Sequence, residues 1–324
     1  NKIFRIYSDS IEPTIDSLKK EFPKEPDVSE RAWENSLKAK AFDLLRGLLP
    51  AGTLSHVGMF ASGQAYEQMI MRMLASPLPE ANDYGQRILK ELQTTIPSFL
   101  SRIERPERGG EWIDYFVDRR ENTKEAFQSL SPTSGSEGKA SVKLIETRGG
   151  EDDLLESCLF ETADLSSEEI RSLVDGASIE DKDKIFAAAL GNRSNRRHRP
   201  GRGWESVSYR FEIVSDYGAF RDLQRHRMLT CQWQELSPEL GADVPEQLPE
   251  SVASEYRRGL DLSAQTYEAI KASTDSTIAQ YSLCLGYRIR YILDLNAREA
   301  MQLTELRSGV EGHPSYRAVA QEMH

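Results

Sequence analysis

Residues 130–141, LSPTSGSEGKAS, separate two parts of the chain that differ in hydrophobic periodicity, and this change constrains the fold more than any other feature. The stretch is rich in Ser, Gly and Pro and carries almost no apolar residues, which is typical of a linker. Before it, residues 30–48 and 62–75 carry apolar residues at helical spacing. We therefore predict a mostly helical part over 1–130, a linker at 131–140 and a second domain over 141–324.

The second domain starts with strand patterns. SVKLIET at 141–147 predicts a strand, and residues 205–214 alternate apolar with polar side chains, as expected of a strand with one buried and one wet face. Later patterns predict helices at about 217–228, 251–272, from 274 to about 291, 296–307, and a terminal helix ending at His324. This order predicts an α/β (α+β layered) fold, an antiparallel-containing sheet flanked by helices.

Composition excludes several classes of protein. The net charge of −11 makes nucleic acid an unlikely partner and argues against an anionic membrane surface. No apolar run approaches the roughly 18 residues of a membrane span, and the first residues lack a signal-peptide pattern. Cys158, Cys231 and Cys284 are odd in number and too dispersed for a metal ligand set. We expect a cytoplasmic protein without a metal site.

Positive charge is concentrated at Arg225, His226 and Arg227. At a helix end the two guanidinium groups could surround one anion or planar ring, with His226 adding a donor. The alternative is a solvated basic turn paired with carboxylates.

A second polar pattern lies near the C-terminus. Asn296, Ala300, Leu303 and Arg307 share one helical stripe, so a polar residue at each end could reach a ligand lying along the helix. The alternative is an amphipathic helix whose ends are polar by chance.

The order of these features resembles the flavin-dependent thymidylate synthases, whose signature is R-H-R-x-x-S-x-N-E-x-S-x-R. The resemblance covers residues 141–324. Glu205 lies twenty residues before Arg225, as does the strand carboxylate of the family, and His313 falls near the family's flavin-contacting histidine. Asn296 and Arg307 occupy the C-terminal polar ladder, with Gln302 in place of a second Asn.

The resemblance implies a thymidylate synthase complementing protein-like fold and a homo-oligomer with composite sites between subunits. It implies reductive methylation of dUMP to dTMP, in which NADPH reduces FAD and methylenetetrahydrofolate supplies the carbon. Arg307 would polarise the pyrimidine as the catalytic residue, and Thr230 and Arg46 would bind substrate. The implied cofactor-binding residues are Glu205, Arg225, His226, Arg227, Gln232, Asn296, Gln302 and His313.

The segment after Arg227 departs from the family signature. Its Ser, Asn, Glu, Ser and Arg are replaced by Thr230, Gln232, Trp233, Glu235 and Ser237, which removes a carboxylate acceptor and a phosphate-binding fork. Two interpretations therefore stay open. One is an enzyme of this type, or a divergent flavoenzyme acting on a nucleotide-like substrate; the other is a noncatalytic flavin- or nucleotide-binding paralogue with a structural or regulatory role.

The helical part shows a faint internal repeat, because residues 42–95 and 276–323 share an arrangement of helices and breaks. We interpret it as a degenerate first copy. Arg46 lies four residues before Pro50, where the family has a phosphate-binding arginine, whereas Gln280 stands before Cys284 in the second copy. The hypothesis is a composite site in which Arg46 faces the Arg225–Arg227 turn; the alternative is a surface arginine.

The segment RRHRPGRG at 196–203 combines arginines with two glycines. Its backbone amides and positive charge suit a phosphate-holding loop. A nucleic-acid arm would look similar, and the global charge disfavours it.

Overall fold

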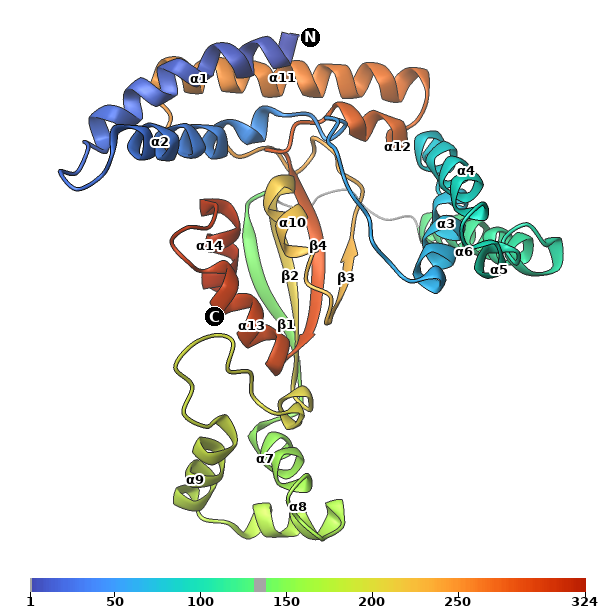
Figure 1. Ribbon diagram of the computed structural model, residues 1–324, viewed down its shortest axis with the longest axis vertical. Helices are drawn as coiled ribbons and strands as arrows, with labels where there is room; N and C mark the ends of the chain where they lie inside the picture. The colour runs from blue at the N-terminus through green and yellow to red at the C-terminus, as the bar shows by residue number, and fades with distance from the viewer. Residues whose placement is uncertain (1, 131–137) are drawn as a thin grey trace. The chain divides into compact units, whose positions relative to one another are not determined.

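The computed structural model describes residues 2–130 and 138–324 (Figure 1). The described residues divide into two compact units. The larger unit contains residues 2–52, 138–268 and 280–324, and the smaller contains 53–130 and 269–279. Most of the predicted linker, 131–137, lies outside the described residues, so the boundary there stays a prediction.

Among described residues up to 130, every regular element is helical. Local signals explain where several helices begin: the Ser29 and Ser62 side chains accept hydrogen bonds from backbone N–H groups of the first turn, and Pro79 and Pro97 occupy first helical positions. The elements are α1 (Lys2–Glu21), α2 (Glu30–Leu45), η1 (Arg46–Leu48), α3 (Gly63–Leu74), α4 (Pro79–Gln93), α5 (Pro97–Leu100), η2 (Pro106–Gly110) and α6 (Glu111–Ser129).

The larger unit holds a four-stranded antiparallel sheet of order β1-β2-β4-β3. Its strands are β1 (Ser141–Arg148), β2 (Ser208–Asp216), β3 (Leu229–Trp233) and β4 (Arg288–Asn296). The register pairs Ser208 with Asn296 and Asp216 with Arg288. The predicted fold class, α/β with an antiparallel-containing sheet flanked by helices, is confirmed.

The helices that follow β1 in the sequence are labelled in Figure 1, apart from the short η3 and η4. They are α7 (Glu151–Phe160), α8 (Ser167–Gly176), α9 (Ile179–Leu190), η3 (Arg202–Glu205), α10 (Tyr217–Leu223), α11 (Glu250–Ser273), α12 (Ser276–Ala279), η4 (Gln280–Ser282), α13 (Ala297–Arg307) and α14 (Pro314–Met323). Leu155, Ile170, Trp204 and Ala297 belong to one buried cluster, so α7, α8, η3 and the start of α13 pack together.

Three predictions of secondary structure were wrong. The helix expected over 217–228 ends at Leu223, because Leu229–Trp233 pairs with β4 instead. The helix expected from 274 to 291 is replaced by the short α12 and η4, followed by β4. In β4 the residues Ile289, Tyr291, Leu293 and Leu295 are buried while their neighbours are half-buried, a period of two that specifies a strand. Glu205 lies in η3 rather than in the strand, which begins at Ser208.

None of the helices in the described residues combines the length and apolar character needed to cross a membrane.

Candidate functional site

Two residues that the sequence singled out meet directly. Arg307 at the end of α13 donates from Nε to His226 Nε2 at 3.1 Å and from Nη2 to the carbonyl of Asp222 at 2.9 Å. The other imidazole nitrogen, Nδ1, lies 2.8 Å from Glu299 Oε1. The His226 and Glu299 side chains are only 6% and 11% exposed, so the contact is shielded from water. The turn after α10 and the helix α13 are thereby fixed to one another.

The donors around His226 determine where its proton lies. An arginine Nε always carries hydrogen, so Nε2 of His226 must accept. Nδ1 therefore carries the proton and donates to the Glu299 carboxylate. The guanidinium carbon of Arg307 also lies 5.4 Å from the ring centroid of Tyr316, a cation–π distance. Glu299, His226 and Tyr316 thus hold the Arg307 guanidinium in one orientation.

Arg46 joins this cluster from the helical part of the chain. Its Nη1 lies 3.1 Å from Asp222 Oδ2, and both side chains are mostly buried. Arg225, which is 66% exposed, lies 3.5 Å from the other oxygen of the same carboxylate. The Nε and Nη2 atoms of Arg46 are buried and have no hydrogen-bond partner among the residues that the structure describes. Buried guanidinium donors are rarely left unpaired, so these atoms are suited to bind an additional acceptor.

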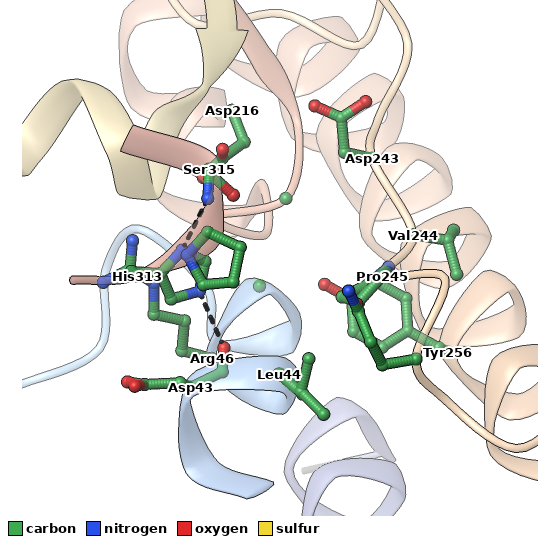
Figure 2. Close-up of a pocket in the computed structure, with 14 residues that line it drawn as sticks. Asp43, Leu44, Arg46, Asp216, Asp243, Val244, Pro245, Tyr256, His313 and Ser315 are labelled. Atoms are coloured by element: carbon green, nitrogen blue, oxygen red, sulfur yellow. Dashed lines mark hydrogen bonds between the residues drawn. The ribbon is translucent and has the colours of Figure 1, made fainter. Parts of the chain in front are cut away.

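A cavity of about 100 Å³ lies beside Arg46 (Figure 2). It is lined from the helical part by Asp43 and Arg46, from the end of β2 by Asp216, and from the start of α14 by His313 and Ser315. His313 Nε2 lies 2.9 Å from the carbonyl oxygen of Asp43, and its Nδ1 accepts from the backbone N–H of Ser315 at 3.2 Å. The α14 helix is therefore attached to α2 through one imidazole.

Burial dominates the acid–base chemistry of this cavity. It raises the pKa of Asp216 above the ordinary value. Hydrogen bonds from the Ala219 N–H and the Ser315 side chain, and the charges of Arg46 and His313, act in the opposite direction. Burial, and then the charge of Arg46, lowers the pKa of His313 below its ordinary value. Both shifts favour the neutral form, so Asp216 competes less with an anion for Arg46, while His313 contributes less positive charge.

Two glycines permit this close packing. A Cβ at Gly47 would lie 1.9 Å from the Tyr256 hydroxyl. A Cβ at Gly218 would lie 2.9 Å from Asp216 Oδ1 and 3.4 Å from Arg46 Nε. A side chain at either position would displace a buried polar group of the cluster.

The structure brings together some predicted site residues and not others. Arg46, His226 and Arg307 share one network of contacts, and His313 lines the cavity beside Arg46. Asn296 caps α13 by accepting from the N–H of Glu299 at 2.9 Å, which places that carboxylate in the first turn. The roles assigned to these residues stay predictions.

The remaining predicted residues lie away from these contacts. Arg227 is exposed, and Thr230 and Gln232 are exposed on the edge strand β3. Glu205 binds Arg202 at 2.9 Å and lies 3.6 Å from Arg298. Gln302 is half-buried within α13.

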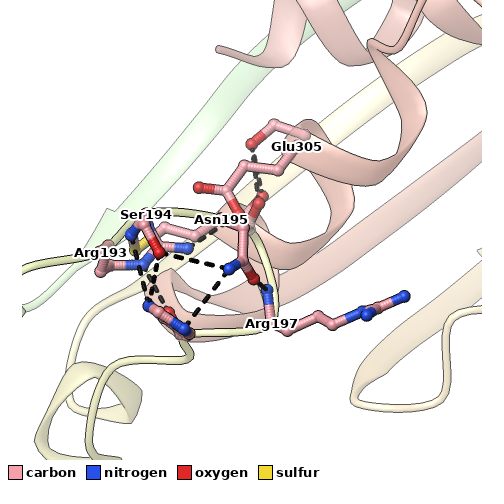
Figure 3. Close-up of polar contacts among 9 residues, drawn as sticks. Arg193, Ser194, Asn195, Arg197 and Glu305 are labelled. Atoms are coloured by element: carbon pink, nitrogen blue, oxygen red, sulfur yellow. Dashed lines mark hydrogen bonds and ion pairs between the residues drawn. The ribbon is translucent and has the colours of Figure 1, made fainter.

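The basic loop before β2 is tied to α13 (Figure 3). Arg193 donates to Glu305 Oε2 at 2.8 Å and to the carbonyl of His198 at 2.5 Å. Asn195 Oδ1 accepts from the N–H of Arg197, which fixes the turn, and the Arg197 side chain is exposed. The phosphate-holding role of this loop stays a prediction.

The profile of the family described as thymidylate synthase complementing protein matches residues 156–324, which is more than half of the chain and includes β2, β3, β4 and the Arg307 cluster. The chain belongs to the thymidylate synthase complementing protein family. Its resemblance to this family, inferred from the Arg225–Arg227 motif and the residues downstream, is confirmed.

The chain spans about two thirds or less of the length of the curated relatives that it matches. A UPF0159 protein of Chlamydia muridarum is 36% identical over 99% of the chain, which spans 61% of that relative. A UPF0159 protein of Thermoplasma acidophilum is 26% identical over the whole chain, which spans 68% of it. The UMP/dUMP methylase PolB of Streptomyces cacaoi, solved with 5-Br dUMP, is 15% identical with a TM-score of 0.43, over 58% of this chain and 89% of the methylase.

The family motif alone misses the carboxylates of the cluster. Asp222 precedes the Arg225–Arg227 motif and binds both Arg46 and Arg225, and Glu299 orients His226. Both had a local signal. Asp222 is three residues before Arg225, and Glu299 is three residues after the cap Asn296, a spacing that places Glu in the first turn of a helix.

Proposed function

We propose that this chain carries the nucleotide site of a thymidylate synthase-type methylase, which methylates a dUMP-like nucleotide with methylenetetrahydrofolate as carbon donor, FAD as cofactor and NADPH as reductant. The observation that carries the proposal is the pair of unpartnered donors on buried Arg46, next to the Arg307 cluster in a member of this family. The substrate, the cofactor and the activity rest on family membership together with this geometry.

The cavity beside Arg46 suits one anionic group of a nucleotide. Its volume of about 100 Å³ is below the roughly 300 Å³ of a small-molecule pocket, so it would take a phosphate and leave the sugar and base outside. Arg46 would supply two hydrogen bonds to a phosphate oxygen. Asp216, whose pKa is raised by burial, can accept a proton and so repel the anion less.

In this proposal Arg307 acts on the pyrimidine. Its guanidinium is oriented before any ligand arrives, because His226 and the Asp222 carbonyl fill two of its donor positions. A fixed positive charge stabilises negative charge that develops on a carbonyl oxygen of the base without reorganising during the reaction. In this scheme His226 and Glu299 are positioning residues.

Fewer residues are available to bind FAD than to bind the nucleotide. Arg225 and Arg227 are exposed and can donate to a flavin phosphate or ring edge, and the half-exposed Trp233 can stack on an aromatic ring. These residues fit the anionic part of FAD better than they define a closed flavin pocket. The chemistry that bound FAD would supply is the transfer of reducing equivalents to the nucleotide.

The test is release of tritium from C5 of dUMP by purified protein supplied with FAD, NADPH and methylenetetrahydrofolate. We expect release by the parent and at least a tenfold loss in Arg307→Lys, since lysine cannot keep both the His226 contact and the fork geometry. Arg221→Lys, a change at an exposed arginine of α10, is the matched control and should retain the parent rate. No release by parent protein that binds both FAD and dUMP would contradict the proposal.

A noncatalytic binding module is the second candidate. It is favoured by the neutralisation of two cations, since the Asp222 carboxylate contacts both Arg46 and Arg225. It is also favoured by Trp233 and Ser237, which stand where the family signature has a carboxylate and an arginine. Binding of dUMP or flavin without tritium release would support this candidate.

A further inference from the structure

Residues 53–62, TLSHVGMFAS, present apolar side chains to solvent. Leu54 and Val57 are 85% and 80% exposed, and Met59 and Phe60 are exposed as well. Among the described residues this stretch is assigned to neither helix nor strand. Four exposed apolar side chains within seven positions indicate a surface that another part of a protein covers.

The residues just before this stretch form a reciprocal contact with a distant segment of the larger unit. Pro50 and Cys284, separated by 234 positions, form an isolated antiparallel bridge. Around it, Ala51 N donates to Leu283 O at 2.7 Å and Leu285 N donates to Leu49 O at 2.9 Å. The two donors, Ala51 and Leu285, are 234 positions apart, and so are the two acceptors, Leu49 and Leu283. Exchanging the two copies therefore converts one hydrogen bond into the other.

A second pair of bonds obeys the same rule. Gly52 N donates to Tyr281 O at 3.0 Å, and Gly286 N donates to Gly47 O at 2.8 Å. In a two-fold contact, residue i touches j while the equivalent of j touches the equivalent of i. The bridge therefore has the hydrogen-bond pattern of a two-fold interface inside one chain.

The same separation relates the neighbouring elements. The turns η1 (Arg46–Leu48) and η4 (Gln280–Ser282) are 234 positions apart. So are the caps Ser62 and Asn296, which accept from the N–H groups of Ala65 and Glu299 and begin α3 and α13. The separation is thus constant on both sides of 53–62.

At this separation of 234 positions, residues 54–62 align with residues 288–296, which form β4 in the second copy. Val57 and Met59 correspond to Tyr291 and Leu293, which are 1% and 0% exposed in β4. His56 corresponds to Arg290 on the other, half-buried face. Val57 and Met59 therefore occupy positions that a sheet buries in the second copy, whereas Leu54 and Phe60 correspond to Arg288 and Asp294 on the half-buried face.

We propose that residues 54–62 are the β4-equivalent strand of a second sheet. Strands equivalent to β2 and β3, from the same longer polypeptide, pair with its two edges as β2 and β3 pair with β4. The Chlamydia muridarum relative supplies the length, because 326 aligned residues are 61% of it and leave about 200 outside the match. The stretch from β1 to β3 in the second copy, residues 141–233, is shorter than that. The proposal is independent of the proposed catalytic function.

The test begins with the intact mass of the polypeptide that the source organism makes, and continues with hydrogen exchange of that polypeptide and of this 324-residue chain. We expect a longer native polypeptide, in which the amides of 55–61 exchange on the order of 100-fold more slowly than in this chain. Val57→Asp should abolish the protection in the longer polypeptide, and His56→Asp, the matched control on the opposite face, should retain most of it.

Three outcomes would overturn the proposal. The first is a native polypeptide no longer than this chain, and the second is a longer one in which 55–61 exchanges as fast as in the chain alone. The third is protection that appears in this chain on concentration, together with a dimer, since the covering partner would then be a second copy.

Discussion

Glu299 is the residue whose replacement tests the arrangement of His226 and Arg307 most sharply. Glu299→Leu leaves Nδ1–H of a nearly buried imidazole without an acceptor, which costs about 1–3 kcal/mol. Glu299→Gln keeps an acceptor of the same shape and loses only the charge on it. Because a hydrogen bond to a charged group is worth about 1.5–3 kcal/mol and a neutral one about 0.5–1.5, this variant should lose about 1 kcal/mol.

The assay is urea unfolding followed by tryptophan fluorescence, since three of the four tryptophans, Trp33, Trp204 and Trp233, lie in the larger unit. Glu322→Gln, at an exposed position of α14, is the control and should leave the unfolding midpoint unchanged. Nitrogen-15 NMR of the histidines reports the same contact directly, and we expect the His226 proton on Nδ1. A proton on Nε2, or equal stability of the Leu and Gln variants, would refute the proposed orientation of Arg307.

Two further predictions concern the cavity beside Arg46. Because burial and Arg46 lower the pKa of His313, folding favours its neutral form; this stabilisation is present above about pH 6.5 and is lost as pH falls through the folded-state pKa. The stability difference between the parent and His313→Gln should therefore decrease from pH 7.5 to pH 5.5 in urea unfolding, and an unchanged difference would contradict it. Gly218→Ala should destabilise by about 1–3 kcal/mol in urea unfolding, since its Cβ meets Asp216 Oδ1 at 2.9 Å, whereas Gly176→Ala, which meets nothing within 4 Å, should be neutral or stabilising in the same assay.

The sequence was most informative where one local pattern decided the structure. The alternation from Val207 to Ile213 predicted β2, and the periodicity of residues 30–48 and 62–75 predicted α2 and α3. The same test, applied to Ile289, Tyr291, Leu293 and Leu295, would have identified β4, but cap-like residues at 274–276 suggested a helix instead. β3 could not be predicted locally, because Leu229–Trp233 is a strand only through its pairing with β4.

The site shows the same division between local and long-range information. The motif at Arg225–Arg227 and the position of Arg307 singled out two segments that the structure brings into contact through His226. The contact of His226 with Glu299 joins residues 73 positions apart, and that of Arg46 with Asp222 joins residues 176 apart. Spacing along one helix cannot reveal such pairs, because the fold alone sets their distance.

The most direct test of the central claim, that Arg46 provides an anion site next to Arg307, is calorimetric binding of dUMP and of deoxyuridine to the parent and to Arg46→Ala. Two charge-assisted hydrogen bonds to phosphate, weakened by competition from Asp222, should be worth about 1.5–3 kcal/mol. The account predicts that Arg46→Ala weakens dUMP binding by about 10- to 100-fold and leaves deoxyuridine binding unchanged. Equal dUMP affinity in the variant and the parent, or equal loss for both ligands, would contradict it.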